Sequence, residues 1–155
     1  MLRPRIIPCL LVKNKGLVKT VGFKNPKYVG DPINAVRIFN EKEVDELAVL
    51  DIDATIEKRE PDYIMIEHLA AECRMPLCYG GGVTTSEQVQ RIVQLGVEKV
   101  AISSAAINNP DLVSRSAERV GNQSIVVVLD ARKAFTGNKY EVWTHNGRKN
   151  TGKNV

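Results

Sequence analysis

Residues that can do chemistry lie directly after apolar runs of this sequence. Asp51 follows one run, "YGGGV" at 79–83 closes another, and Ser103 and Ser104 follow a third. Asp130 ends an unbroken apolar stretch, where an acid is costly to bury unless it is partnered or used. Carboxylates can act as general acids or bases, while glycine backbone and hydroxyl groups can hold an anion. We therefore take these residues as candidates for an acid–base site beside an anion site.

Each candidate also has a purely structural explanation. Glycines 80–82 can form a tight turn between a strand and a helix, and Asp51 can cap a loop. The two serines can cap a helix. Three consecutive glycines exceed what a turn needs, so phosphate binding and a simple turn both stay open at this point.

The apolar runs alternate with amphipathic segments along the chain, which predicts parallel strands covered by helices. In such folds ligands bind at the carboxyl ends of the strands, so the candidates are expected to converge. The strands are expected at 5–12, 46–53, 75–82, 99–104 and 124–130, and the helices at 35–43, 61–74, 86–96 and 109–121.

The pattern changes after Asp130, where 139–149 alternates like a half-exposed strand and Asn146-Gly147 signals a turn. A small hairpin is expected there, and the sequence stops where a fifth helix should follow. A doubly wound sheet is the alternative, but it would need that helix. We favour a (β/α)₈ TIM barrel, in which residues 1–155 form the N-terminal half plus strand five of one domain whose C-terminal half is absent.

Composition narrows the function classes. Of the 155 residues, 43% are apolar, and the net charge of +4 comes from scattered Lys and Arg, which does not indicate nucleic-acid binding. No apolar run is long enough for a membrane span. Cys9, Cys73 and Cys78 lack a Cys-x-x-Cys spacing, so we expect reduced, mostly buried thiols in a cytoplasmic protein. No metal-binding constellation or cofactor motif is evident.

Two groups of charged residues are ambiguous. Residues 13–27 carry five lysines among glycines, which suits either a mobile lid over an anion or a solvated basic loop. Arg5, Glu46 and Lys99 stand at the starts of three expected strands. From the residues alone, ordinary solvated charge is the simpler explanation for these three.

The segments "RIIPCL", "GDPINA", "DELAVLDIDAT", "PLCYGGGV", "KVAISSAAINNP", "IVVVLDAR" and "GRKNTG" together closely resemble the cyclase subunit of imidazole glycerol phosphate synthase. The resemblance runs through the whole chain. It implies a (β/α)₈ barrel built of two similar halves and a lyase-type enzyme. It also implies a glutaminase partner, whose ammonia enters at the bottom of the barrel and reacts at the top with a phosphorylated substrate.

The resemblance also implies residue roles. Gly81, Gly82, Ser103 and Ser104 would form the phosphate site of this half, Lys19 would be a lid residue near the substrate, and Asp51 a substrate-side acid. Asp130 would be one of two catalytic carboxylates. Arg5, Glu46 and Lys99 would be three members of a charged ammonia gate, with the fourth beyond Val155.

One departure from the family pattern stands out. The family's other catalytic acid belongs in a Cys-Leu-Asp-Val context, and this sequence has Leu11 at that position. Leucine cannot transfer a proton, so cyclisation that relies on two carboxylates should be crippled. Pro8 and Tyr79 are milder departures.

Three hypotheses follow. The first is a paralogue that keeps the ammonia route and glutaminase docking but has changed substrate. Relatives of this kind supply ammonia to an amidotransferase that turns an acetamido sugar into an acetamidino sugar in bacterial surface-polysaccharide synthesis. The second is an ordinary histidine-pathway cyclase that tolerates Leu11. The third is a non-catalytic activator of the glutaminase. A half-barrel alone would also expose apolar edges, so self-association is expected.

Overall fold

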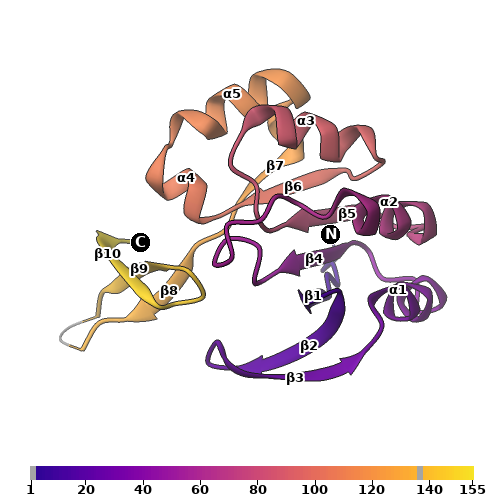
Figure 1. Cartoon of the computed structure of the whole chain (residues 1–155), viewed down its shortest axis with the longest axis horizontal. Helices are drawn as coiled ribbons and strands as arrows, with labels where there is room; N and C mark the ends of the chain where they lie inside the picture. The colour runs from indigo at the N-terminus through magenta and orange to yellow at the C-terminus, as the bar shows by residue number, and fades with distance from the viewer. Residues whose placement is uncertain (1–2, 136–137) are drawn as a thin grey trace.

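A curved seven-stranded sheet organises the described part of the chain, residues 3–135 and 138–155 of the computed structural model (Figure 1). The strand order is β3-β2-β1-β4-β5-β6-β7. Five of these strands run parallel: β1 (Cys9–Lys13), β4 (Leu47–Asp51), β5 (Leu77–Gly80), β6 (Lys99–Ile102) and β7 (Ile125–Val127). The five predicted strands are thus confirmed, although the first begins at Cys9, so Arg5 precedes it, and the fifth ends at Val127, so Asp130 lies beyond it.

The helices follow the parallel strands and are α1 (Pro32–Glu41), α2 (Tyr63–Glu72), α3 (Ser86–Gln94), α4 (Ser104–Asn108) and α5 (Asp111–Val120), with a short 3₁₀ turn η1 (Asn122–Ser124) after α5. Side-chain caps fix where the first three begin. Asp31 accepts from the Asn34 N–H and Asp62 from the Met65 N–H. Thr85 and Gln88 form a reciprocal capping box at α3.

The two faces of the parallel strands have different surroundings. Residues of one face are buried against the helices, where they form the core with Val36, Ile66, Leu69, Val89, Ile92 and Leu112. The opposite face carries aligned rows, of which the first is Cys9, Ala48, Cys78 and Lys99 and the second Leu11, Leu50, Gly80 and Ala101. The parallel strands are apolar on both faces for two reasons. One face packs against the helices in the core, and the other lines the concave side of the sheet.

The parallel strands follow one another across the sheet in the order in which they occur in the chain, which is β1, β4, β5, β6 and β7. A doubly wound sheet would instead reverse its strand order at a switch point. The α/β class is therefore confirmed, and the arrangement is that of part of a (β/α)₈ barrel.

The prediction of a mobile loop over residues 13–27 is wrong, because most of this segment belongs to an ordered antiparallel hairpin. Strands β2 (Gly16–Val21) and β3 (Lys24–Gly30) extend the sheet beyond β1. Its two turns use left-handed backbone at Asn14 and Lys15, and at Gly22 and Phe23. Residues 18–21 alternate in burial, as in a half-exposed strand.

A separate sheet stands next to the carboxyl ends of the parallel strands (Figure 1). It contains β8 (Asp130–Lys133), β9 (Tyr140–Thr144) and β10 (Lys149–Asn154) in the order β10-β9-β8, all antiparallel. The predicted hairpin is confirmed and gains a third strand. Trp143 pairs with Asp130 across β8 and β9, and the Arg132 guanidinium lies 4.5 Å from its ring centre.

Two further expectations can be compared with the structure. The thiols are not mostly buried, because Cys9 is exposed and only Cys78 is fully buried. Cys9 lies at the start of β1 on the face that no helix covers, which explains its exposure. Within the described residues, no helix combines the length and apolar character needed to cross a membrane.

Candidate functional site

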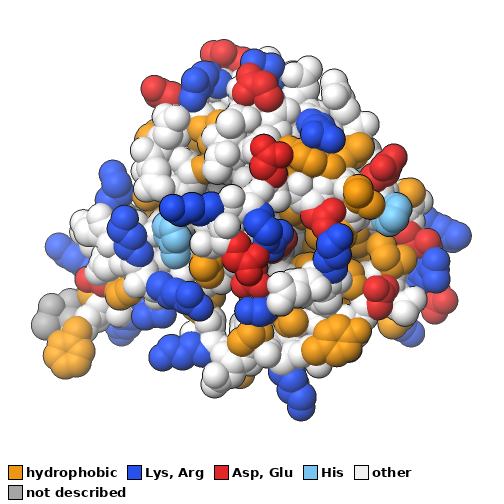
Figure 2. All heavy atoms as spheres, in the orientation of Figure 1, with side chains coloured by type: hydrophobic (Ala, Val, Ile, Leu, Met, Phe, Trp, Pro, Cys, Tyr) orange, Lys and Arg blue, Asp and Glu red, His pale blue; other side chains and the backbone are white. Residues whose placement is uncertain are grey.

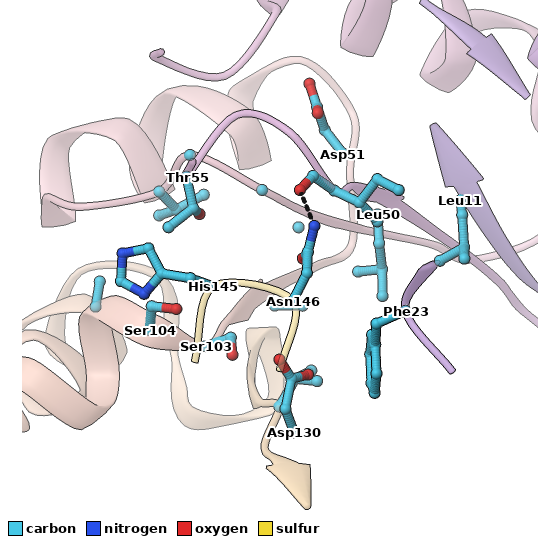
Figure 3. Close-up of a pocket in the computed structure, with 18 of the residues that line it drawn as sticks. Leu11, Phe23, Leu50, Asp51, Thr55, Ser103, Ser104, Asp130, His145 and Asn146 are labelled. Atoms are coloured by element: carbon cyan, nitrogen blue, oxygen red, sulfur yellow. Dashed lines mark hydrogen bonds between the residues drawn. The ribbon is translucent and has the colours of Figure 1, made fainter. Parts of the chain in front are cut away.

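The carboxyl ends of the parallel strands enclose a cavity of about 260 Å³ (Figure 3). Its walls come from the ends of β1, β4, β5 and β6, the tip of the β2–β3 hairpin, and the turn between β9 and β10. Residues from the sequence prediction that line it are Leu11, Asp51, Gly81, Gly82, Ser103, Ser104 and Asp130. The strand-end candidates therefore converge as the parallel-sheet argument predicted.

The glycines after β5 are required by close packing. Gly81 and Gly82 have φ of +124° and +71°. A Cβ on Gly81 would lie 2.4 Å from the Asp51 carbonyl oxygen, and one on Gly82 would lie 2.6 Å from that of Arg59. The structural explanation therefore accounts for both glycines by itself. It also brings bare backbone to the cavity wall, which is what close approach of an anion needs.

The two serines after β6 lie beside this glycine segment. Ser103 occupies the N-cap position of α4, yet its side chain makes no capping hydrogen bond. Ser103 and Ser104 both line the cavity and are half-buried. Helix capping therefore does not occupy the Ser103 hydroxyl, which leaves it available to a ligand.

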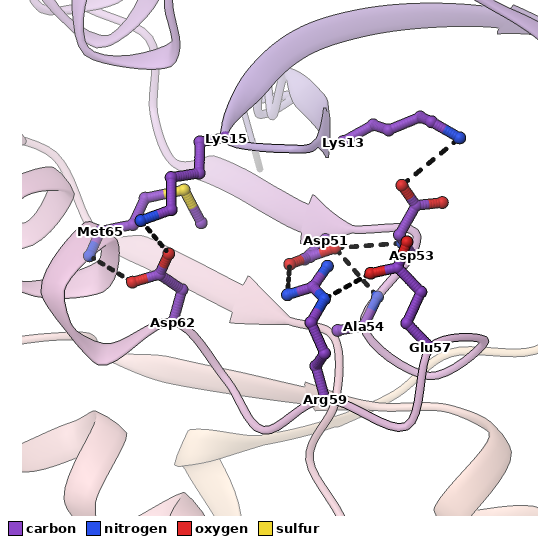
Figure 4. Close-up of polar contacts among 9 residues, drawn as sticks. All are labelled: Lys13, Lys15, Asp51, Asp53, Ala54, Glu57, Arg59, Asp62 and Met65. Carbon is purple, nitrogen blue, oxygen red and sulfur yellow. Dashed lines mark hydrogen bonds and ion pairs between the residues drawn. The ribbon is translucent and has the colours of Figure 1, made fainter.

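Asp51 is buried and already engaged (Figure 4). Its Oδ1 accepts hydrogen bonds from the backbone N–H groups of Asp53, at 3.0 Å, and Ala54, at 3.1 Å. Its Oδ2 lies 3.5 Å from Nη1 of Arg59. Loop capping is thus a real function of Asp51, and its carboxylate is less free for proton transfer than that of Asp130.

Neighbouring ion pairs attach the β1–β2 turn to the loop after β4 (Figure 4). Lys13 Nζ lies 3.5 Å from Asp53 Oδ2, and Lys15 Nζ lies 3.2 Å from Asp62 Oδ2. Burial opposes ionisation of Asp62, but the Met65 N–H and Lys15 together lower its pKa. The basic residues of this segment therefore act partly as anchors.

Lys19 lies on β2 with its side chain exposed, and it is not among the residues that line the cavity. Thr20 and Phe23 of the same hairpin do line it, and were not predicted. Their positions depend on the hairpin turn, which the lysine-rich composition obscured. The lid role of Lys19 stays a prediction.

Asp130 is the first residue of β8 and faces the cavity. Its Oδ2 accepts a hydrogen bond from the Gly147 N–H at 3.2 Å. Burial raises the pKa of this carboxyl, while the Gly147 N–H and the charge of Arg132 oppose that rise. A carboxyl with a raised pKa can exchange protons nearer to neutral pH, as an acid–base group needs.

Leu11 lies in β1 beside Leu50 and supplies an apolar wall at the place where the resemblance expects a second acid. In Figure 3, Leu11, Leu50 and Phe23 lie together on one side of the view and Asp130 lies below them. The cavity therefore has an apolar side next to its acid.

The turn after β9 contributes two residues that the sequence prediction missed, His145 and Asn146. Asn146 Nδ2 donates to the Ile52 carbonyl oxygen at 2.7 Å, which joins this turn to the loop after β4. Asn146-Gly147 was recognised as a turn, but the docking of that turn onto the cavity depends on contacts with residues far away in sequence.

At the amino ends of the strands, three charged residues form one cluster. Arg5 Nη2 and Lys99 Nζ lie 2.6 and 2.7 Å from the same oxygen, Oε2 of Glu46. Glu46 is buried, whereas Arg5 and Lys99 keep partial access to solvent. The structure therefore brings the three predicted gate residues together and shows that they are not separate solvated charges.

The face in Figure 2 carries many Lys and Arg side chains around its lower left, over the β8–β10 sheet and the hairpin. Exposed cations of the β8–β10 region are Lys133, Lys139, Arg148, Lys149 and Lys153. Such a field favours an anionic ligand in the neighbouring cavity. Among the residues that the structure describes, no cluster of three His, Cys, Asp or Glu could hold a metal ion.

Comparison with known proteins shows the family of this chain. The family described as "Histidine biosynthesis protein" matches residues 5–155. A Vibrio vulnificus protein, provisionally named imidazole glycerol phosphate synthase subunit hisF3, is 62% identical over 96% of this chain and 57% of its own length. A similarly named Leptospira borgpetersenii HisF is 58% identical over 100% of this chain and 61% of its own.

A third relative has a name that is not provisional. It is the imidazole glycerol phosphate synthase subunit HisF of Dehalococcoides mccartyi, which is 41% identical over 98% of this chain and 59% of its own length. The chain thus spans about 57–61% of the length of these curated relatives. Its sequence is nearer to the provisionally named group than to this HisF.

Proposed function

Because this chain belongs to the family of histidine biosynthesis proteins, we propose that it is part of a HisF-like synthase subunit that uses ammonia from a glutaminase partner. The ammonia would react with a phosphorylated small molecule in the cavity at the carboxyl ends of the strands. The proposal covers both ends of the parallel strands, since the charge cluster lies at one end and the cavity at the other.

The charge cluster supports the ammonia route. Arg5, Glu46 and Lys99 converge on one carboxylate at the amino ends of β1, β4 and β6. An exposed Arg5 at this position can open or close without disturbing the buried Glu46, because Lys99 still pairs with it. A partly exposed ion pair at an entrance is compatible with a gate for a small neutral molecule.

The cavity supports a phosphorylated substrate. Gly81 and Gly82 bring backbone to its wall, and Ser103 and Ser104 bring hydroxyl groups to the same end. Asp130, with its pKa raised by burial, would take a proton from the nitrogen that attacks the substrate.

Leu11 is the observation that favours one reaction over the other. Asp130 is the cavity carboxyl that remains available, because Asp51 caps a loop and Leu11 replaces the second acid. We therefore favour amidation, in which an acetamido sugar of surface-polysaccharide synthesis becomes an acetamidino sugar. The higher identity to the hisF3-type relative also supports a paralogue.

Cyclisation in histidine biosynthesis is the second candidate. It is favoured by His145, which places another titratable side chain on the cavity wall, and by the name of the Dehalococcoides relative.

Leu11→Asp in the complete gene product tests the choice, with Leu11→Asn as an uncharged control of similar size. If amidation is correct, the gene does not rescue a histidine auxotroph. Leu11→Asp then raises ammonia-dependent cyclisation by about 100-fold or more, the usual contribution of an acid–base group, and Leu11→Asn does not.

Robust rescue by the unaltered gene, with little further gain from Leu11→Asp, would overturn amidation in favour of the cyclase. Stimulation of the glutaminase without turnover of any ligand would instead indicate the non-catalytic activator.

A further inference from the structure

The turn between β9 and β10 is attached to the cavity at two points. Asn146 Nδ2 donates to the Ile52 carbonyl oxygen at 2.7 Å, and the Gly147 N–H donates to Asp130 Oδ2 at 3.2 Å. The first contact joins residues 94 positions apart in the sequence. The turn is therefore a fixed part of the cavity wall.

Its backbone conformation places one side chain in the cavity. His145, Asn146 and Gly147 have φ of +55°, +56° and +64°, a left-handed run that His and Asn tolerate better than most residues. This run turns the chain so that His145 and Asn146 both line the cavity.

The imidazole of His145 is itself oriented by a neighbour. Nδ1 lies 3.1 Å from Oγ1 of the buried Thr144, so Nε2 is the ring nitrogen left for a ligand. In Figure 3 the ring lies on the same side of the view as Ser104 and Thr55, away from Leu11 and Phe23. It belongs to the polar end of the cavity.

We propose that His145 is a ligand-contacting residue of this cavity, whose imidazolium form donates from Nε2–H to an anionic phosphate oxygen. The Thr144 hydroxyl donates to the Lys149 carbonyl oxygen and therefore accepts from Nδ1–H. Asn146 is the positioning residue that holds the turn against the Ile52 carbonyl. The inference rests on the proposed phosphate site of Gly82, Ser103 and Ser104 and adds a donor from the β9–β10 turn beside Ser104. Surrounding cations such as Lys149 and Arg148 favour the same anion.

The chain offers a direct test because it has only two histidines, and His68 is exposed on α2 outside the cavity lining. Histidine-labelled protein is titrated with inorganic phosphate at constant pH and ionic strength, and both imidazoles are followed by NMR. Calorimetry measures phosphate binding in the same samples. We expect a saturable shift of the His145 signals with the calorimetric dissociation constant and little change at His68.

Asn146→Ala should weaken phosphate binding by about 2–10-fold, the worth of one neutral hydrogen bond. Asn150→Ala is the matched control, because Asn150 donates to Glu141 Oε2 at 3.0 Å in the same sheet but does not line the cavity. It should leave the affinity unchanged.

The other outcomes separate the two proposals. Calorimetric binding with a His145 signal that moves no more than that of His68 would overturn the His145 contact alone. Absence of binding would overturn the phosphate site of the proposed function and the His145 contact with it. Equal losses in Asn146→Ala and Asn150→Ala would overturn the positioning role of Asn146.

Discussion

At the scale of single residues, Asp130 combines two opposed effects. Burial disfavours its charge, while the Gly147 N–H and Arg132 favour it, and the net result is a raised pKa. A group of this kind costs stability when ionised. A residue kept despite such a cost is typical of functional sites.

Asp130→Asn should therefore stabilise the fold at neutral pH, with the Asn side-chain oxygen still accepting from Gly147. Because the pKa is higher in the folded state, the folded protein binds more protons, and stability is lost as pH rises from the usual Asp value of 3.8 through the folded pKa. The melting temperature of the variant should exceed that of the wild type at pH 7, and the gap should close at about pH 3. A constant gap across pH would contradict this.

The sequence predicted most of the site at this scale, since Asp51 ends a parallel strand, Gly82, Ser104 and Asp130 follow within three residues of one, and such ends converge. It could not reveal that Asp51 is engaged by backbone N–H groups. It also missed His145, whose place depends on a hydrogen bond across 94 residues. Local sequence patterns predict where strands end, but they do not predict that a turn distant in sequence packs against those ends.

At the scale of elements, the parallel strands and their helices were predictable because apolar runs and amphipathic segments alternate. The β2–β3 hairpin was not, since its lysines and glycines suggested a mobile loop. Two lysines just before the hairpin, Lys13 and Lys15, pair with Asp53 and Asp62. Charge patterns alone cannot distinguish such anchors from solvated side chains.

The cluster of Arg5, Glu46 and Lys99 joins the amino ends of three elements and depends on its single acid. Glu46→Gln removes the charge that both cations share, and we expect it to cost about 2–3 kcal/mol, below the range for a fully buried pair because Arg5 is half exposed. Lys99→Met leaves Glu46 paired with Arg5 and should cost about 1 kcal/mol. Urea unfolding measures both, and equal costs would mean that Glu46 is not the centre of the cluster.

At the scale of the whole molecule, the sheet has two open edges. β7 is the last strand of the order, and Val127 and Leu129 near it remain 47% and 42% exposed. At the other edge β3 is almost entirely exposed and rich in lysine, which discourages edge pairing. The apolar edge is therefore the one that invites a partner.

The 155-residue chain by itself should self-associate through β7 in light scattering. Placing lysine at both Val127 and Leu129 should shift it toward monomer, because charged edge residues oppose strand pairing. Val21→Lys is the matched control, since Val21 is 83% exposed on the hairpin away from β7. A wild-type chain that stays monomeric at all concentrations would contradict the expectation, as would equal effects of the two changes.

The only tryptophan of the chain, Trp143, lies directly across from Asp130 in the β8–β9 pair and two residues before His145. The Arg132 guanidinium lies 4.5 Å from the centre of its ring, so we expect its emission to change when this sheet shifts. We therefore expect intrinsic fluorescence to report occupation of the cavity, without a label and without knowing the reaction.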